Sequence, residues 1–151
     1  MFYFFFTACK KEEFDFITVL DVLEHIPKEG TIAFLKSLYG SLKQSGRAIL
    51  QVPNLQAIDG QLHHFNDFTH LTGYVEHSLR QVLLASGPCD GQLEFYGFET
   101  FIGLGVKVAM KKVLRQFYWK RAKFRRKMTG NLNVSIMHPV FYAVVSKNSC
   151  S

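Results

Sequence analysis

Hydrophobic and polar positions along this chain fall into blocks that predict strands and helices in turn. Residues 14–20 are rich in β-branched and aromatic side chains without strict alternation, which is typical of a strand covered on both faces of a parallel sheet. The apolar residues that follow recur every three or four positions, which predicts a helix that lays one stripe on that sheet. The stripe consists of Ile32, Leu35, Leu38, Tyr39 and Leu42.

A second strand completes a strand–helix–strand unit. We expect Gly46 to close the helix and residues 48–52 to form the strand, which ends at Pro53 and Asn54. The fold class is therefore expected to be α/β. The same rules predict a helix with its buried face at Leu79, Val82 and Leu83, strands at residues 92–98 and 140–146, and a helix at residues 106–127.

Polar residues follow the first predicted strand directly, at Asp21, Glu24 and His25. In open α/β sheets the ligand lies beyond the carboxyl ends of the strands, so these side chains fall where chemistry is placed. A second interpretation is that Glu24 and His25 cap the following helix, with Pro27 near its start. The two interpretations are compatible.

Several segments together carry a resemblance to a known family. They are residues 14–17 (FDFI), 21–27 (DVLEHIP), 42–46 (LKQSG) and 52–54 (VPN), followed by 65–70 (FNDFTH) and 78–87 (SLRQVLLASG). In order and spacing they resemble strands four and five, and the segment beyond, of class I S-adenosylmethionine-dependent methyltransferases. The resemblance implies a Rossmann-like fold, S-adenosylmethionine as cofactor, and methyl transfer to an oxygen of a sugar or another small-molecule or glycan acceptor.

The resemblance also implies which residues bind the cofactor. The loop after the first strand would close over it, so Leu20, Asp21 and His25 are the positions carried over from the family. The glycine-rich turn of the family has no counterpart, because no glycine precedes Gly30. We therefore expect residues 1–13 to be a non-homologous or truncated N-terminus and residues 14–151 to be the C-terminal part of the domain, with a helical insertion at 103–128.

Such a chain is expected to bind the cofactor weakly or not at all when alone. Two functions stay open at this point. One is a truncated methyltransferase, either active or inactive. The other is a non-catalytic, methyltransferase-like remnant that binds a membrane or a protein partner.

Four of the six histidines lie between residues 63 and 77, where the acceptor pocket is expected. A histidine has the pKa to take a proton from an acceptor hydroxyl, and a carboxylate can hold its tautomer, so His64, Asp67 and His70 are the candidate catalytic residues. Local turn bonds at Asp67 and packing of the histidines on Phe65 and Phe68 explain the segment equally well. Metal ligation by these residues is less favoured, because no established zinc pattern is present, and no metal is expected.

Charge divides the chain unevenly. Residues 1–99 hold 7 of the Lys and Arg residues and all 12 Asp and Glu, whereas residues 100–151 hold 11 basic residues and no acid. Ten of these basic residues lie within 106–127 together with an apolar stripe, which is typical of a helix at a membrane surface. A helix that packs its stripe on the sheet and leaves its basic face in solvent is slightly favoured over membrane contact. Nucleic-acid binding is not expected, because no reading motif accompanies the charge.

The three cysteines are far apart in the sequence, so no disulfide framework is predicted. This usage fits a cytoplasmic protein. The basic segment adds the expectation of a position peripheral to the inner face of the membrane.

Overall fold

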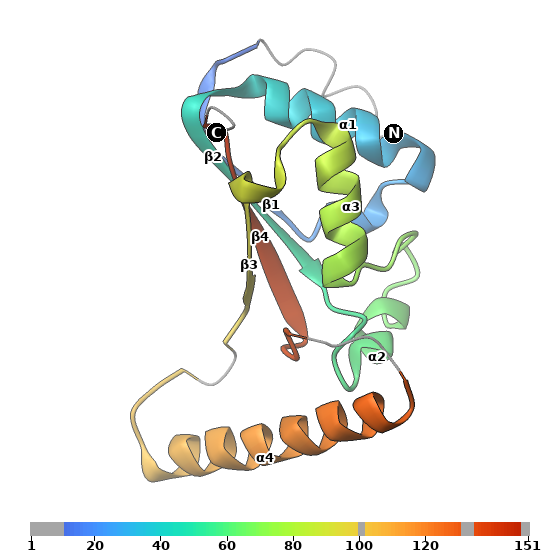
Figure 1. Ribbon diagram of the computed structural model, residues 1–151, viewed down its shortest axis with the longest axis vertical. Helices are drawn as coiled ribbons and strands as arrows, with labels where there is room; N and C mark the ends of the chain where they lie inside the picture. Colours follow the sequence, from blue (N-terminus) through green and yellow to red (C-terminus); the bar gives the residue numbers. More distant parts are fainter. Residues whose placement is uncertain (1–10, 100–101, 131–134, 149–151) are drawn as a thin grey trace.

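The computed structural model describes residues 11–99, 102–130 and 135–148. Its order of elements begins with β1 (Phe14–Leu20), a 3-10 turn (Leu23–His25), α1 (Lys28–Ser41) and β2 (Leu42–Pro53). It continues with α2 (Gly60–Phe65), α3 (Glu76–Ser86), a second 3-10 turn (Asp90–Gln92), β3 (Leu93–Gly97), α4 (Val106–Met128) and β4 (Val140–Ser146). The expected α/β class is thus confirmed for the described residues (Figure 1).

The four strands form one mixed sheet in the order β1-β2-β4-β3. β1 and β2 are parallel and joined through α1, which confirms the predicted strand–helix–strand unit. β4 runs antiparallel to both β2 and β3, so the last strand in the sequence is inserted between them. β4 is the strand that was predicted at residues 140–146.

One face of the sheet carries the core. Along β2, Ala48, Leu50 and Val52 are buried, whereas Arg47, Ile49 and Gln51 between them are exposed or half-buried. Figure 1 shows α1 and α3 together on the same side of the sheet, and their inward residues Leu35, Leu38, Leu79 and Leu83 are buried in the core.

The expectation of a first strand covered on both faces is wrong for the described structure. β1 lies at the edge of the sheet, and Val19 is its one buried residue. Phe16 and Leu20 are each 54% exposed. The physical reason is that α1 and α3 cover a single face, so side chains on the opposite face have no packed layer above them.

Two boundaries differ from the prediction. α1 ends at Ser41 rather than at Gly46, and β2 begins at Leu42. The register of β2 with β1 is irregular near this start, and Ser45 within the strand has a left-handed backbone conformation (φ 65°). The short helix α2 was not predicted, since six residues are too few to show a helical period. Gly87 ends α3 with φ 133°, as the glycine there predicts.

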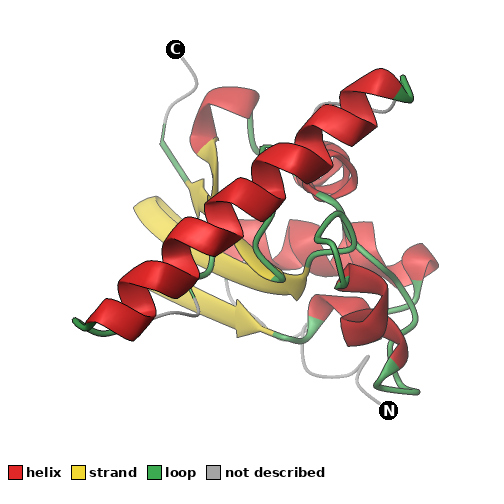
Figure 2. Cartoon of the chain, turned by 90° about the horizontal axis from the view of Figure 1, so that it is seen from below, coloured by secondary structure: helices red, strands yellow, loops and turns green. Residues whose placement is uncertain are grey.

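α4 lies apart from the α1/α3 layer, beyond the end of the sheet (Figure 1), and Figure 2 shows it crossing in front of the strands when seen from below. The favoured expectation that its apolar stripe packs on the sheet is wrong, because no described residue of α4 is buried. Contacts to the rest of the protein come instead from the opposite side of the helix. There Arg126 donates to the carbonyl oxygen of Gln56 at 2.7 Å and Trp119 meets His138 edge-on at 4.6 Å between ring centroids.

Two further findings concern the cysteines and the character of the helices. Cys89 is disulfide-bonded, which corrects the expectation that the cysteines form no disulfide. Among the described helices, none combines the length and the apolar character needed to span a bilayer.

Candidate functional site

Two loops meet at the carboxyl ends of the parallel strands β1 and β2. The loop after β1 runs through residues 21–27, and the segment after β2 runs from Asn54 to Val75. The backbone N–H groups of Leu71 and Thr72 both donate to the carbonyl oxygen of Glu24, at 2.8 and 3.0 Å. The prediction that Asp21, Glu24 and His25 fall at this edge is therefore confirmed, and His70 joins them from the second loop.

Glu24 lies at the centre of this meeting point. Its side chain is 1% exposed, and neither carboxylate oxygen meets a hydrogen-bond donor among the described residues. The pKa of Glu24 is raised above its usual value, and burial is the main cause. Its own backbone N–H lowers the pKa, Asp21 raises it further, and the charges of His25 and His70 lower it. Its ion-pair partner among the described residues is His70, whose Nε2 lies 3.9 Å from Oε1 of Glu24.

Neither Glu24 nor His25 caps the helix that follows. α1 begins at Lys28 with Pro27 at its N-cap position, and no side chain caps it there. Thr31 donates instead to the carbonyl oxygen of Pro27, at 3.2 Å. The capping interpretation of Glu24 and His25 is thus wrong, which leaves the burial of Glu24 without an explanation from helix stability.

His70 is held in one tautomer by the backbone. Its Nδ1 lies 3.0 Å from the carbonyl oxygen of His64, and because a carbonyl can only accept, Nδ1 carries the proton. Nε2 is therefore the lone-pair nitrogen when His70 is neutral. This nitrogen faces two carboxylates, since it lies 3.9 Å from Glu24 and also 3.9 Å from Oδ2 of Asp67.

His25 is held in a similar way by Thr69. Nδ1 of His25 lies 3.2 Å from the carbonyl oxygen of Thr69 and 2.9 Å from its hydroxyl. The hydroxyl of Thr69 in turn donates to Oδ1 of Asp67 at 2.7 Å, so His25 is the donor to Thr69 and keeps its Nε2 free. The rings of His25 and His70 lie edge to face, with centroids 4.8 Å apart.

Asp67 is occupied by a local turn. It accepts from both the hydroxyl and the backbone N–H of Thr69, and these two bonds hold the pKa of Asp67 below its usual range. The prediction of local turn bonds at Asp67 is confirmed. The ring of His70 is oriented by the backbone carbonyl of His64 and not by Asp67. The expected packing on Phe68 is wrong, because that side chain is fully exposed, while His64 does pack edge-on against Phe65.

The structure brings together His64, Asp67 and His70, the three residues predicted as catalytic. The ring of His64 stacks on that of His70 with centroids 5.6 Å apart, and its buried Nδ1 has no hydrogen-bond partner among the described residues. His63 and His77 are exposed and take no part in this group. His63 and His77 had also been left out of the predicted catalytic residues.

The predicted cofactor residues lie along the open edge of β1. Leu20 is the last residue of the strand and is 54% exposed. Asp21 follows in a left-handed conformation (φ 51°) that aspartate tolerates, and Nε2 of Gln51 donates to both of its carboxylate oxygens at 3.2 and 3.1 Å. Both residues thus present their side chains to solvent beside the buried Glu24.

Sequence reasoning assigned no role in chemistry to Glu24 beyond its position, and it treated His25 as a cofactor residue only. Glu24, His25 and His70 nevertheless place their potential ligand atoms within 4.8 Å of one another. The signal that could have found this group is the adjacent Glu-His pair directly after a strand. It could not name the third member, because His70 lies 45 positions after His25 in the sequence.

Comparison with protein families places the chain's first half in a known domain. The family model described as "Methyltransferase domain" matches residues 2–87, which is more than half of the chain. No curated protein sequence matches the chain.

Several solved structures that are similar to this chain are methyltransferases. A SAM-dependent methyltransferase from Archaeoglobus fulgidus aligns with a TM-score of 0.63 at 18% identity, over 93% of this chain and 62% of its own length. A possible histamine N-methyltransferase from Thermotoga maritima aligns at 0.58 and 13% identity, over 93% of this chain and 58% of that protein. A candidate O-methyltransferase from Nostoc punctiforme aligns at 0.56 and 12% identity, over 94% and 34%. At these identities the similarity shows the fold, and this chain spans less than two thirds of each of these proteins.

Proposed function

Because the chain belongs to the Methyltransferase domain family, whose members use S-adenosylmethionine, we propose that it serves in methyl transfer from this cofactor to an oxygen of a sugar or another small acceptor. The acceptor and the activity of this chain are part of the proposal. The observation that carries it is the meeting of Asp21, Glu24 and His25, from the loop after β1, with His70 from the loop after β2. That edge of an α/β sheet is where ligands bind.

The proposed reaction is a direct in-line displacement. The acceptor oxygen attacks the methyl carbon, the carbon–sulfur bond breaks with its electron pair going to sulfur, and the cofactor leaves as S-adenosylhomocysteine. The proton of the acceptor hydroxyl is lost at the group around His70, whose Nε2 is the lone-pair nitrogen. Positioning of the two reactants supplies most of the rate enhancement, since no covalent intermediate with the protein is needed.

Roles follow from the placement of the side chains. Leu20, Asp21 and His25 lie on the side of β1 where the family resemblance puts the cofactor. His64 positions His70 through its carbonyl, and Asp67 holds Thr69, which in turn holds His25. His64 and Asp67 are therefore proposed as positioning residues and His70 as the residue that faces the acceptor.

Calorimetric titration of the chain with S-adenosylhomocysteine tests this proposal. We expect weak, saturable binding that is lost when Asp21 and His25 are both replaced by alanine. His77→Ala is the matched control, because His77 is exposed and lies outside the site. Absence of saturable binding would contradict a cofactor role for this chain and favour the non-catalytic alternative, in which the chain is a membrane- or partner-binding module.

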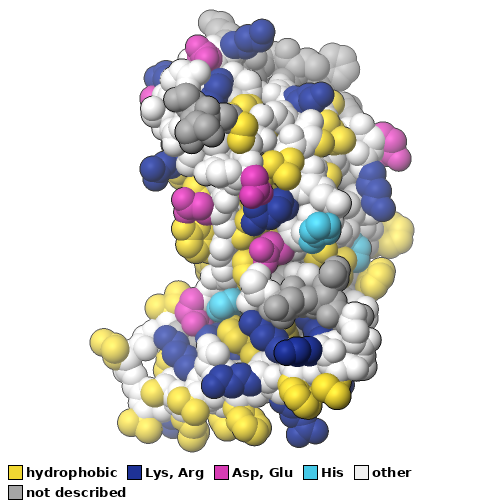
Figure 3. All heavy atoms as spheres, viewed as in Figure 1, with side chains coloured by type: hydrophobic (Ala, Val, Ile, Leu, Met, Phe, Trp, Pro, Cys, Tyr) yellow, Lys and Arg dark blue, Asp and Glu magenta, His cyan; other side chains and the backbone are white. Residues whose placement is uncertain are grey.

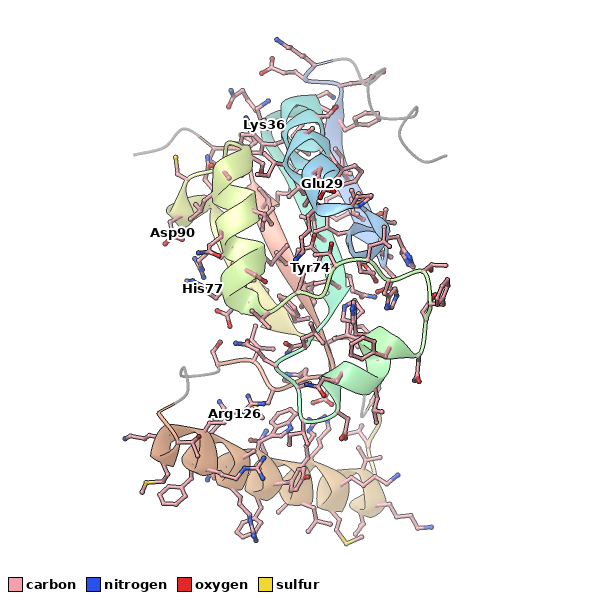
Figure 4. The ribbon with its side chains drawn as sticks, turned by 90° about the vertical axis from the view of Figure 1, so that its right-hand side faces the viewer. Glu29, Lys36, Tyr74, His77, Asp90 and Arg126 are labelled. Carbon is pink, nitrogen blue, oxygen red and sulfur yellow. The ribbon has the colours of Figure 1, made fainter. Side chains whose placement is uncertain are left out.

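A second function is proposed for α4, namely contact with an anionic membrane surface. Its large apolar side chains are mostly more than half exposed, and they lie on the side of the helix opposite Arg115, Trp119 and Arg126, which contact the body of the protein. Figure 4 shows Arg126 on the side of α4 that faces α2 and the sheet. The outward apolar residues are Met110, Val113, Leu114, Phe117, Tyr118, Phe124 and Met128.

Basic residues flank this outward stripe, and Figure 3 shows Lys and Arg side chains interleaved with apolar ones along α4. An apolar stripe bordered by cations is the arrangement that inserts at the headgroup level of an anionic bilayer, where each nearby Lys or Arg contributes about 1 kcal/mol. A lipid-linked glycan acceptor would be consistent with this contact. A location peripheral to the inner face of the membrane would be consistent with this contact.

Co-sedimentation with vesicles tests the membrane contact. We expect the chain to bind phosphatidylglycerol vesicles, to bind phosphatidylcholine vesicles much less, and to dissociate at high salt. Phe117→Gln should weaken binding, whereas Phe16→Gln, an exposed phenylalanine on β1, should leave it unchanged. Equal loss in both variants would contradict a role for α4.

A further inference from the structure

We propose that Glu24, His25 and His70 form a binding site for a divalent transition-metal cation, for which Mn²⁺ and Co²⁺ are suitable probes. The potential ligand atoms of these three residues lie within 4.8 Å of one another. Two imidazole nitrogens and one carboxylate oxygen are a ligand set that holds such cations while leaving coordination positions open. The earlier expectation of no metal considered residues 63–70 without Glu24 and His25.

The first argument is the burial of Glu24. A carboxyl group that is 1% exposed and accepts no hydrogen bond from a described residue is unfavourable in its ionised form unless an opposite charge compensates it. No Lys or Arg side chain is paired with Glu24 among the described residues; its one ion-pair partner there is His70. A cation bound to the carboxylate would supply the missing charge and occupy its unused oxygen atoms.

The second argument is the orientation of the two histidines. Nδ1 of His70 donates to the carbonyl of His64, and Nδ1 of His25 donates to Thr69. A ring whose Nδ1 is fixed by a backbone carbonyl offers Nε2 as a metal ligand in the correct tautomer. Both histidines of the group have this support, and Asp67 extends it at His25 by holding the hydroxyl of Thr69.

Distances favour a cation over a direct ion pair. Nε2 of His70 and Oε1 of Glu24 are 3.9 Å apart, which is too long for a hydrogen bond between them. Two ligand atoms bound to one tetrahedral ion at about 2.1 Å lie about 3.4 Å apart. The observed separation therefore needs to contract by only about 0.5 Å for these two atoms to share an ion.

Negative charge around the group also favours a cation. Oδ2 of Asp67 lies 3.9 Å from Nε2 of His70, and Asp21 is close enough to Glu24 to affect its ionisation. The group thus gathers three carboxylates around the two histidines, and a bound cation would offset part of that negative charge.

Cation binding does not depend on the proposed methyl transfer. The role of the cation in the reaction does rest on that proposed function. A cation at this position has open sites for an acceptor hydroxyl, and it lowers the pKa of a hydroxyl that coordinates it. The acceptor oxygen would then be held and ionised at the same edge where the cofactor is proposed to bind. Because Nε2 of His70 would be a ligand of the cation, the hydroxyl proton would be released to solvent and not to His70. Acceptors with two adjacent hydroxyl groups fit such a site best, since both oxygens can coordinate one ion.

Electron paramagnetic resonance of Mn²⁺ tests the site, because the signal of the free aqueous ion is lost when the ion binds. We expect the full 151-residue chain, freed of metal beforehand, to bind one Mn²⁺ per chain. Glu24→Gln and His70→Asn should each weaken binding by about tenfold or more. His77→Asn is the matched control, since it removes an exposed histidine outside the group.

Thermal unfolding without metal separates loss of ligation from loss of fold. Glu24→Gln removes a buried charge, so the variant is expected to keep or gain stability in metal-free buffer while losing the stabilisation that Mn²⁺ gives the wild type. Equal Mn²⁺ affinity in the wild type and both ligand variants would overturn the proposal, as would an equal loss in His77→Asn. Because the probe is the metal alone, a negative result leaves the S-adenosylhomocysteine titration to decide the proposed function separately.

Discussion

His138 occupies an enclosed position between two parts of the molecule. Its ring meets Trp119 of α4 edge-on, its Nδ1 is buried without a hydrogen-bond partner in the described structure, and a Cβ placed on Gly97 would lie only 1.9 Å from that nitrogen. Burial lowers the pKa of His138, and the nearby charge of Arg115 lowers it further while Glu99 opposes. The folded protein therefore prefers this histidine neutral.

This preference makes stability depend on pH. As the pH falls through about 6.5, the unfolded chain takes up the proton first, so the contribution of His138 to the free energy of unfolding is lost on acidification. We expect the free energy of unfolding to fall less between about pH 7.5 and about pH 5.5 in His138→Gln than in the wild type. Urea unfolding followed by circular dichroism at both pH values measures this, and parallel losses in the two proteins would contradict it.

Single residues of the candidate site could be predicted from the sequence only in part. Asp21, Glu24 and His25 follow a strand directly, so the topology of α/β sheets alone was enough to place them at a ligand-binding edge. His70 was already named from the sequence together with His64, but its position beside Glu24 and His25 could be found only from the fold. The burial of Glu24 is likewise a tertiary property that no local pattern carries.

At the scale of elements, β2 shows that one face of the sheet is packed more closely than the other. Leu50 is fully buried against the helices, and its neighbour Ile49 points to the other face and is half-buried. Leu50→Ala should lower the free energy of unfolding by about 2–5 kcal/mol because it leaves a cavity. Ile49→Ala should cost about 1 kcal/mol or less, since it removes about half as much buried apolar area.

Denaturant unfolding of the two variants measures this difference. The pair is closely matched, because the residues are isomers in one strand and both change to alanine. Equal destabilisation would show that the second face of the sheet is packed as well as the first, which would contradict the one-sided core described for residues 11–99, 102–130 and 135–148.

Elements were predicted well where their own period or composition was strong. β1, α4 and β4 begin at the predicted residues, since β-branched runs and a long helical stripe are local signals. The start of β2 was missed because Lys43, Gln44 and Ser45 are polar and carry no strand pattern. The orientation of α4 was missed for a different reason, since a stripe indicates which side is apolar but not whether anything covers it.

At the scale of the whole molecule, the face of the sheet that α1 and α3 leave uncovered meets the outer edge of β1. Phe16 and Leu20 point to the open face from β1, whose outer edge has no paired strand among the described residues. Unpaired edges with exposed apolar side chains promote association between chains. We expect the sedimentation coefficient of the wild type to rise with protein concentration.

Phe16→Lys should reduce this association, because a charge on an edge strand opposes pairing with a second chain. Leu84→Lys is the control, since Leu84 is an exposed apolar residue on α3, away from the edge. Sedimentation velocity over a concentration series distinguishes the variants. Unchanged association in Phe16→Lys would mean that another surface, such as the apolar side of α4, joins the chains.

The antiparallel pairing of β3 with β4 has a consequence for how this protein could change. Gly97 pairs with Phe141, and the N–H of Phe98 donates to the carbonyl oxygen of Val140 at 3.0 Å, so the chain leaves the sheet and returns to it at adjacent points. A segment whose ends are this close can be lengthened, exchanged or replaced by a tight turn without altering the register of the hairpin. The basic helix is thus a module that could be transplanted onto other sheets, or lost from this one, within a single hairpin loop.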